Sequence, residues 1–127
     1  MSKNITVNPG WPKYDQYTFP PAVKRGNMLF ISGMMGQNPD GSFPPDIVSQ
    51  LDLAFQHIGE VLAAAGATFD DIVKTTDYIT TQKGYKATAD VRRKYFKNGF
   101  PAATGVVVKE LLRPGALVEL DAIAMVG

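Results

Sequence analysis

The sequence predicts a single α+β domain over residues 1–127, in which two helices cover one face of a mixed sheet. The chain has the length of one ordinary domain. Hydrophobic residues make up 45% and charged residues 20%, a balance typical of globular proteins. The expected element order is strand, strand, helix, strand, helix, strand, strand. Such an order favours helices packed on a mixed sheet.

The N-terminal part of the chain, from Asn8 to Pro21, is interrupted by several prolines and a glycine, too many for a regular element. We expect an irregular arm that lies over the body of the protein and is held there by Trp11 and Tyr14. The β-rich residues that follow, 23–33, are broken by Arg25-Gly26-Asn27. This pattern predicts a β-hairpin.

The first helix is expected between Asp46 and Ala65. Apolar residues recur there at i, i+4, i+7, i+8 and i+11, the spacing of one buried helix face. Asp46 is the expected N-terminal cap and Gly66 the expected stop. Thr68 and Asp71 then have the spacing of a capping turn.

The second half of the chain predicts a strand, a helix and two closing strands. Residues 72–80 are rich in β-branched side chains, and residues 83–97 predict the second helix. Residues 102–109 and 117–126 predict the closing strands, joined through the turn signal Arg113-Pro114-Gly115. If both helices cover one face, the other face, expected to be rich in Val, Ile and Leu, needs a cover. Oligomerisation would supply it.

Composition excludes several classes of function. Thirteen Lys and Arg against twelve Asp and Glu give a formal charge of +1, and the basic residues are scattered, so we expect no nucleic-acid partner. With no cysteine and one histidine, we expect neither a disulfide nor a metal site. The start, Met1-Ser2-Lys3-Asn4, has no apolar signal core, and no run approaches a membrane span of about 20 residues. A cytoplasmic protein without a membrane partner is expected.

Four separated segments resemble the reactive intermediate deaminase family, also called RidA or YjgF-type. They are Gly26-Asn27-Met28-Leu29-Phe30-Ile31-Ser32-Gly33, residues 62–76 (LAAAGATFDDIVKTT), Phe100-Pro101-Ala102 and Leu117-Val118-Glu119-Leu120-Asp121-Ala122-Ile123-Ala124. The resemblance implies a chorismate-mutase-like subunit and a homotrimer with clefts between neighbouring subunits. It also implies hydrolysis of reactive enamines or imines to a carbonyl compound and ammonia, without a metal or cofactor.

The chain departs from the family pattern at three positions. The arginine that pairs with the substrate carboxylate in well-known deaminases is replaced here by Ala103, which removes a bidentate guanidinium. A frequent helix asparagine aligns with Ala89. The tyrosine that often precedes the first hairpin has no clean match, with Phe19 nearest by spacing and Tyr17 two residues earlier. We therefore expect a substrate other than a small 2-imino acid.

The remaining candidate residues are matched through the same resemblance. Glu119 corresponds to the carboxylate that orients water or contacts the amino group, and its alternative is a polar residue on an exposed strand face. Ser32 and Gly33 match the strand end that lines the cleft. Thr104 and Gly105 follow the lost arginine and are expected to line the pocket with their backbone. For Ser32 and Gly33 the alternative is a glycine required for a bulge or for close packing, and for Thr104 and Gly105 it is plain strand residues.

Three further polar residues have competing interpretations. Arg92 lies three residues after Ala89, on nearly the same helix face, so it is a candidate replacement anchor; the alternative is a solvated arginine paired with Asp90. Asp77 is expected to be a structural carboxylate that binds Lys74 or Arg93, or that faces a water-filled channel. His57 falls off the apolar stripe, which predicts a solvated residue rather than a general base.

Two other functions compete with imine hydrolysis. A noncatalytic, ligand-binding or chaperone-like trimer would keep the cleft without the chemistry, and the losses at Ala89 and Ala103 favour it. The retained Glu119 favours the hydrolase. A ribonuclease, an activity also attached to this family, is disfavoured because the sequence has no basic, aromatic-lined patch.

Overall fold

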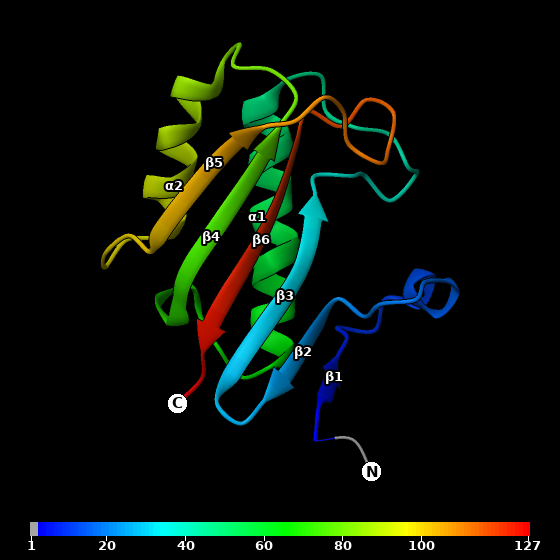
Figure 1. Ribbon diagram of the computed structural model, residues 1–127, viewed down its shortest axis with the longest axis vertical. Helices are drawn as coiled ribbons and strands as arrows, with labels where there is room; N and C mark the ends of the chain where they lie inside the picture. Colours follow the sequence, from blue (N-terminus) through cyan, green and yellow to red (C-terminus); the bar gives the residue numbers. More distant parts are fainter. Residues whose placement is uncertain (1–2) are drawn as a thin grey trace.

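The computed structural model describes residues 3–127 as one six-stranded sheet with two helices on one face (Figure 1). Met1 and Ser2, which belong to the start in which no signal core was expected, lie outside the described residues. The elements are β1 (Ile5–Val7), β2 (Ala22–Arg25), β3 (Met28–Met35), α1 (Ile47–Ala64), β4 (Ile72–Ile79), α2 (Ala89–Tyr95), β5 (Ala102–Val107) and β6 (Val118–Met125), with short 3-10 helices at Pro12–Gln16, Phe69–Asp71 and Tyr85–Thr88.

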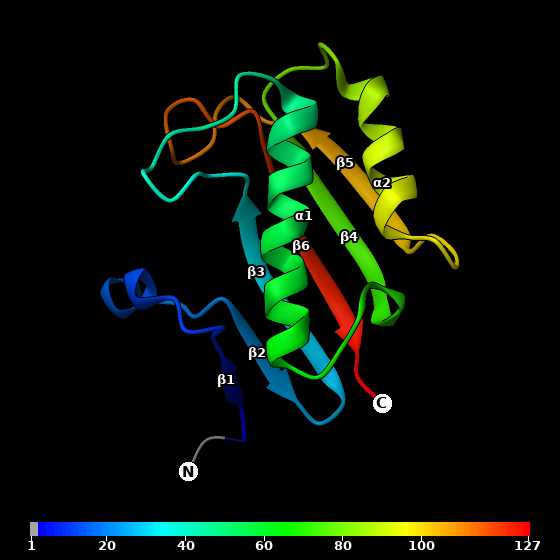
Figure 2. The ribbon, with the colours of Figure 1, turned by 180° about the vertical axis from the view of Figure 1, so that it is seen from behind.

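The strands lie in the order β1-β2-β3-β6-β4-β5. β4 and β5 are parallel, and every other neighbouring pair is antiparallel. The predicted hairpin is confirmed by the pairing of β2 with β3, and the α+β class with both helices on one face is confirmed (Figure 2). Sequence patterns missed β1, a three-residue strand that extends the edge beside β2.

Helix α1 has the boundaries that its periodicity and caps predict. The side chain of Asp46 accepts a hydrogen bond from the backbone N–H of Ser49 at 2.8 Å, and Gly66 follows the helix with a φ of +73°. The capping box of Thr68 and Asp71 is also formed. The apolar stripe of α1 is buried and packs on the sheet, and its members are Ile47, Leu51, Ala54, Phe55, Ile58, Val61 and Leu62.

The second helix is shorter than predicted. Gly84 has a φ of +77°, which interrupts the helical path, and a 3-10 turn at Tyr85–Thr88 precedes α2. The α-helix itself ends at Tyr95, because the backbone of Phe96 has left the helical region. Residues 83–97 therefore form a turn of tight helix and two turns of α-helix rather than one long element.

The face of the sheet opposite the helices is open in the single chain, as Figure 1 shows. The sequence suggested a face rich in Val, Ile and Leu, and the structure shows polar side chains on it as well. Phe30 and Val106 are 45% and 39% exposed there, but Lys74 lies between strands of this face and donates hydrogen bonds to Thr76 and Thr104. The open face is thus a mixture of apolar and polar side chains.

No helix within residues 3–127 combines the length and the apolar composition that crossing a bilayer requires.

Candidate functional site

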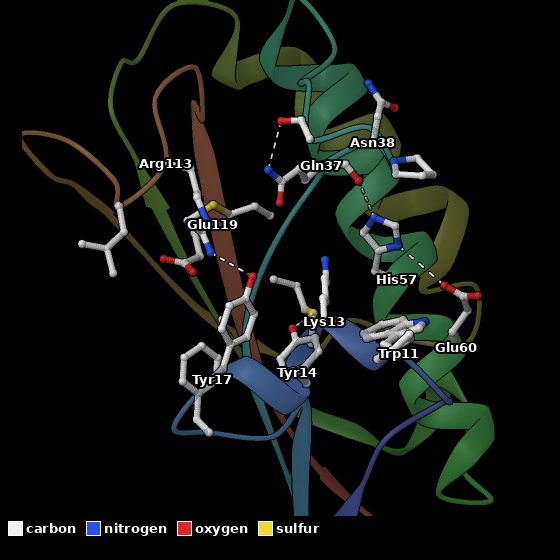
Figure 3. Close-up of a pocket in the computed structure, with 18 residues that line it drawn as sticks. Trp11, Lys13, Tyr14, Tyr17, Gln37, Asn38, His57, Glu60, Arg113 and Glu119 are labelled. Atoms are coloured by element: carbon white, nitrogen blue, oxygen red, sulfur yellow. Dashed lines mark hydrogen bonds and ion pairs between the residues drawn. The ribbon is translucent and has the colours of Figure 1, made fainter.

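A cavity of about 690 Å³ lies at one edge of the sheet. Its walls come from the N-terminal arm, the last residues of β3, one side of α1 and the loop before β6 (Figure 3). The arm contributes a group of aromatic side chains, and the strands and loop contribute charged ones. The residues that matter for the chemistry are Trp11, Tyr14, Tyr17, Phe19, Arg113 and Glu119.

The cavity exists because β3 continues beyond its partner β2. Residues Met28–Ile31 pair with β2, whereas the pairing with β6 continues to Met35 after a register shift between Ile31 and Met34. The arm crosses at this point and is fixed to the strand by Ser32, whose hydroxyl donates to the Pro20 carbonyl at 2.7 Å and whose N–H donates to the Pro21 carbonyl at 2.9 Å. The predicted Ser32 thus holds the arm, and its hydroxyl is already engaged.

Glu119 lines the cavity on the side of Tyr17 and Arg113 (Figure 3). It lies on β6, paired with Met35 on one side and Tyr78 on the other. A Cβ atom at Gly33 would lie 2.6 Å from the Glu119 Oε2 atom, so any larger residue at this position would force the carboxylate to move. No described residue forms a hydrogen bond with this carboxylate. Partial burial, and secondarily the charge of Asp121, raise the pKa of Glu119.

The aromatic side chains of the arm form a continuous wall opposite Glu119. Trp11 stacks on Tyr14 with ring centroids 5.8 Å apart, and Tyr17 stacks on Phe19 at 5.4 Å. Tyr14 also meets Tyr17 edge-on at 5.2 Å. Burial, followed by the neighbouring Tyr17 and the charge of Glu119, raises the pKa of the Tyr14 hydroxyl, so it stays a protonated donor.

The far end of the cavity contains His57, which the sequence placed in solvent. That interpretation is wrong in part: the His57 side chain is 24% exposed, because the arm and the loop after β3 cover it. Its Nε2 atom lies 3.0 Å from the Gln37 carbonyl, and its ring meets Trp11 edge-on at 5.9 Å. Its position off the apolar stripe was predicted correctly, but sequence periodicity gives no information about what packs over the helix.

The structure separates the predicted site residues into two groups. Tyr17, Phe19, Gly33 and Glu119 surround the cavity. Ala103, Thr104 and Gly105 lie on β5, which forms the opposite edge of the sheet. Arg92 belongs to the second group, because α2 packs near β5 (Figure 2).

The guanidinium of Arg92 belongs to a buried polar cluster. It binds the carboxylate of Asp77, donates to the hydroxyl of Tyr85 at 3.1 Å and donates to the hydroxyl of Thr88 at 2.7 Å. Asp77 pairs with the buried Leu120 in the sheet register, whereas Glu119 is on the other face. Within one chain, Arg92 and Glu119 therefore lie on opposite faces of the sheet.

The partner of Asp77 was predicted incorrectly. The carboxylate binds Arg92 and Tyr85 rather than Lys74 or Arg93. Lys74 points to the open face, and Arg93 pairs with Asp90 on the surface. Asp77 is 3% exposed, and its Oδ1 atom has no hydrogen-bond partner within the described part of the chain.

Residues 3–127 contain no group of three or more His, Asp or Glu side chains arranged to hold a metal ion. The cavity is lined by the carboxylates Glu60 and Glu119, the cations Lys13 and Arg113, tyrosine hydroxyls and His57.

Comparison with known proteins identifies the family of this chain. The model of the Endoribonuclease L-PSP family matches residues 14–126. The chain belongs to this family, the RidA/YjgF family. A goat (Capra hircus) protein named 2-iminobutanoate/2-iminopropanoate deaminase is 35% identical over 108 residues, covering 84% of this chain and 78% of its own length.

Solved structures show the same fold. The Rid-family protein YyfA from Yersinia pestis, described as a protein of unknown function, is 34% identical with a TM-score of 0.85, covering 97% of this chain and 99% of its own. Rv2704 from Mycobacterium tuberculosis, a member of the YjgF/YER057c/UK114 family, is 28% identical with a TM-score of 0.83, covering 97% and 99%. The YjgF-type fold predicted for this chain is confirmed.

Proposed function

We propose that this member of the RidA/YjgF family hydrolyses reactive imines, or the enamines that tautomerise to them, and releases ammonia. The observation that carries the proposal is Glu119: a half-buried carboxylate with a raised pKa and no hydrogen-bond partner among the described residues, facing a large cavity. Relatives named as imine deaminases support the same reaction class.

The reaction requires little machinery. A protonated imine carbon is already electrophilic, so the site has to hold the substrate, favour the iminium form and place a water molecule beside the carbon. The Glu119 carboxylate stabilises the iminium charge and accepts a proton from the attacking water. The water oxygen bonds to the carbon and gives a carbinolamine, and the proton held by Glu119 is returned to the nitrogen. The C–N bond then breaks with release of ammonia, while the hydroxyl loses its proton and becomes the C=O group.

The trimer and its intersubunit clefts form part of the proposal. In one chain the residues of β5 and the Glu119 cavity lie at opposite edges of the sheet, so a second copy is needed to bring them into one cleft. The partly apolar open face, with Phe30 and Val106 exposed, supports an interface there. It stays a prediction that a neighbouring subunit contacts the substrate through Ala103, Thr104, Gly105 and Arg92.

The substrate is proposed to differ from a small 2-imino acid. Ala103 offers no guanidinium, and the charge of Arg92 is balanced by Asp77 in the same chain. A cavity of about 690 Å³ falls in the range of about 300–1,000 Å³ that holds drug-sized ligands. A four-carbon imino acid would leave most of it empty.

The test is a panel of imines and enamines generated in situ. An amino-acid oxidase and an amino-acid dehydratase supply them, and ammonia release is followed with and without the protein. Acceleration of at least one member above the rate in buffer is expected. A protein that accelerates none of them, but binds the carbonyl products, would instead favour the noncatalytic binding protein.

A further inference from the structure

Arg113 occupies a fixed position at the mouth of the cavity. It is the first residue of the turn Arg113-Pro114-Gly115-Ala116, in which the Ala116 N–H donates to the Arg113 carbonyl at 3.2 Å and Gly115 has a φ of +89°. A proline second and a left-handed glycine third are the requirements of a type II turn. The sequence signal that predicted the turn thus also fixes the backbone of Arg113.

A buried side chain anchors this turn to the body of the protein. Gln50 on α1 is 1% exposed. Its amide nitrogen donates to the Gly115 carbonyl at 3.0 Å, and its amide oxygen accepts from the Leu117 N–H at 2.8 Å. These two bonds hold the loop at Gly115 and at Leu117, so Arg113, two residues before Gly115, extends from an anchored turn.

The guanidinium of Arg113 is directed at the cavity wall rather than at a carboxylate. It donates to the Tyr17 hydroxyl at 2.9 Å, and its Cζ atom lies 5.7 Å from the centroid of the Tyr17 ring (Figure 3). Within residues 3–127 it forms no ion pair. An arginine has five N–H donors, so donors remain free for a ligand in the cavity that also contains Glu119.

We propose that Arg113, oriented by Tyr17, binds the carboxylate of the substrate in place of the guanidinium missing at Ala103, and that the substrate is a 2-imino acid with an aromatic side chain. This inference rests on the proposed function. The free N–H groups of Arg113 match a carboxylate in a bidentate manner. Glu119 faces the imine, and the aromatic wall from Tyr14 to Trp11 receives the ring.

The aromatic part of the proposal follows from the shape and lining of the cavity. Beyond Glu119 the wall is made of Tyr14 and Trp11, and the cavity ends at His57. A ring there would gain offset or edge-on contacts with these side chains. Lys13 is the other cation of the cavity lining, and its Nζ atom lies 5.7 Å from the centroid of Tyr14, which makes it the residue that the test must separate from Arg113.

The first experiment measures binding without catalysis. Trp11 is the only tryptophan of the chain and lines the cavity, so its fluorescence reports occupancy. We titrate 3-phenylpropanoate and, as the uncharged counterpart, 3-phenylpropanamide. Wild type is expected to bind the carboxylate at least about tenfold more tightly, since hydrogen bonds to charged groups are strong. Arg113→Ala removes the difference, and Arg113→Lys retains part of it.

The control is Arg93→Ala, which removes an exposed arginine from α2, away from the cavity, and is expected to keep the preference. The proposal would be overturned if the preference for the carboxylate survives Arg113→Ala, or if it disappears with Lys13→Ala instead. It would also be overturned if neither compound changes the fluorescence of Trp11. Tyr17→Phe tests the positioning role, because it removes the acceptor for Arg113 and should weaken only the carboxylate ligand.

The second experiment uses two imines that differ only in the carboxylate. Phenylalanine with an amino-acid oxidase yields the 2-imino acid, and 2-phenylethylamine with a flavin amine oxidase yields the imine without it. Arg113→Ala is expected to raise KM about tenfold or more for the first imine alone, with kcat little changed. If wild type hydrolyses neither imine but the binding preference holds, the proposed function fails and the Arg113 site stands. If wild type and Arg113→Ala hydrolyse the 2-imino acid with equal KM values, the Arg113 site fails and the proposed function stands.

Discussion

Removing the carboxylate of Asp77 should destabilise the fold severely. The side chains of Asp77 and Arg92 are 5% and 19% exposed, so Asp77→Ala leaves a largely buried guanidinium without its charge partner. The hydroxyl of Tyr85, which donates to Asp77 at 2.8 Å, loses its acceptor as well. Breaking a buried ion pair by removing one partner costs about 3–5 kcal/mol. We expect Asp77→Ala to lower the free energy of unfolding by that amount.

The size of the effect can be separated from other causes by two further variants. Asp77→Asn keeps an oxygen acceptor for Tyr85 and should be milder than Asp77→Ala. The double variant Asp77→Leu/Arg92→Leu removes both charges, so it should cost less than the two single substitutions together. Asp90→Ala, which breaks only the exposed pair with Arg93, is the matched control and should change stability little.

The assay is urea denaturation followed by circular dichroism, at one protein concentration for all variants because association would shift apparent stability. A loss below about 1 kcal/mol for Asp77→Ala, or a double variant whose loss equals the sum of the single losses, would refute the reasoning. In that case the cluster would be exposed to water in solution and would offer Arg92 freely to a ligand.

Three further predictions concern the site and the assembly. The pKa of Glu119 is raised above its ordinary value of 4.5, so kcat/KM should fall with decreasing pH through a pKa above that value. Asp121→Asn removes a like charge and should move this acidic limb of the pH profile to lower pH. An acidic limb that does not move would assign the titration to another group. Gly33→Ala places a methyl group against the Glu119 carboxylate and should lower kcat/KM about tenfold or more, with the circular dichroism spectrum unchanged. The mass in solution should be close to three times 13.8 kDa, and Phe30→Asp on the open face should lower it; a stable wild-type monomer would contradict the cleft.

Local signals were sufficient for most of the fold. The helix between Asp46 and Gly66 was predicted with its caps, because capping and apolar periodicity depend on neighbouring residues only. The same holds for the capping box at Thr68 and the turn at Arg113. Gly84 shows where local signals were insufficient. Residues 83–97 are rich in residues that favour a helix, but the positive φ of Gly84 shortens the second helix.

The candidate site depended on contacts between distant segments. His57 is covered by Trp11 of the arm, and Asp77 on β4 is paired with Arg92 on α2. Neither contact has a local signature. Arg113 was noticed only as part of a turn, because the hydroxyl that orients it belongs to Tyr17, far away in the sequence. The resemblance to the family identified Glu119, but it could not indicate which cation shares its cavity.

The most direct test of imine hydrolysis at Glu119 is the kcat/KM of wild type and Glu119→Gln on the best imine of the panel. Glutamine keeps the size of the side chain and cannot accept the proton of the attacking water. The predicted result is a loss of about 100-fold or more, the usual contribution of a positioned base, with ligand binding by Trp11 fluorescence retained. A Glu119→Gln variant as active as wild type would contradict the assignment.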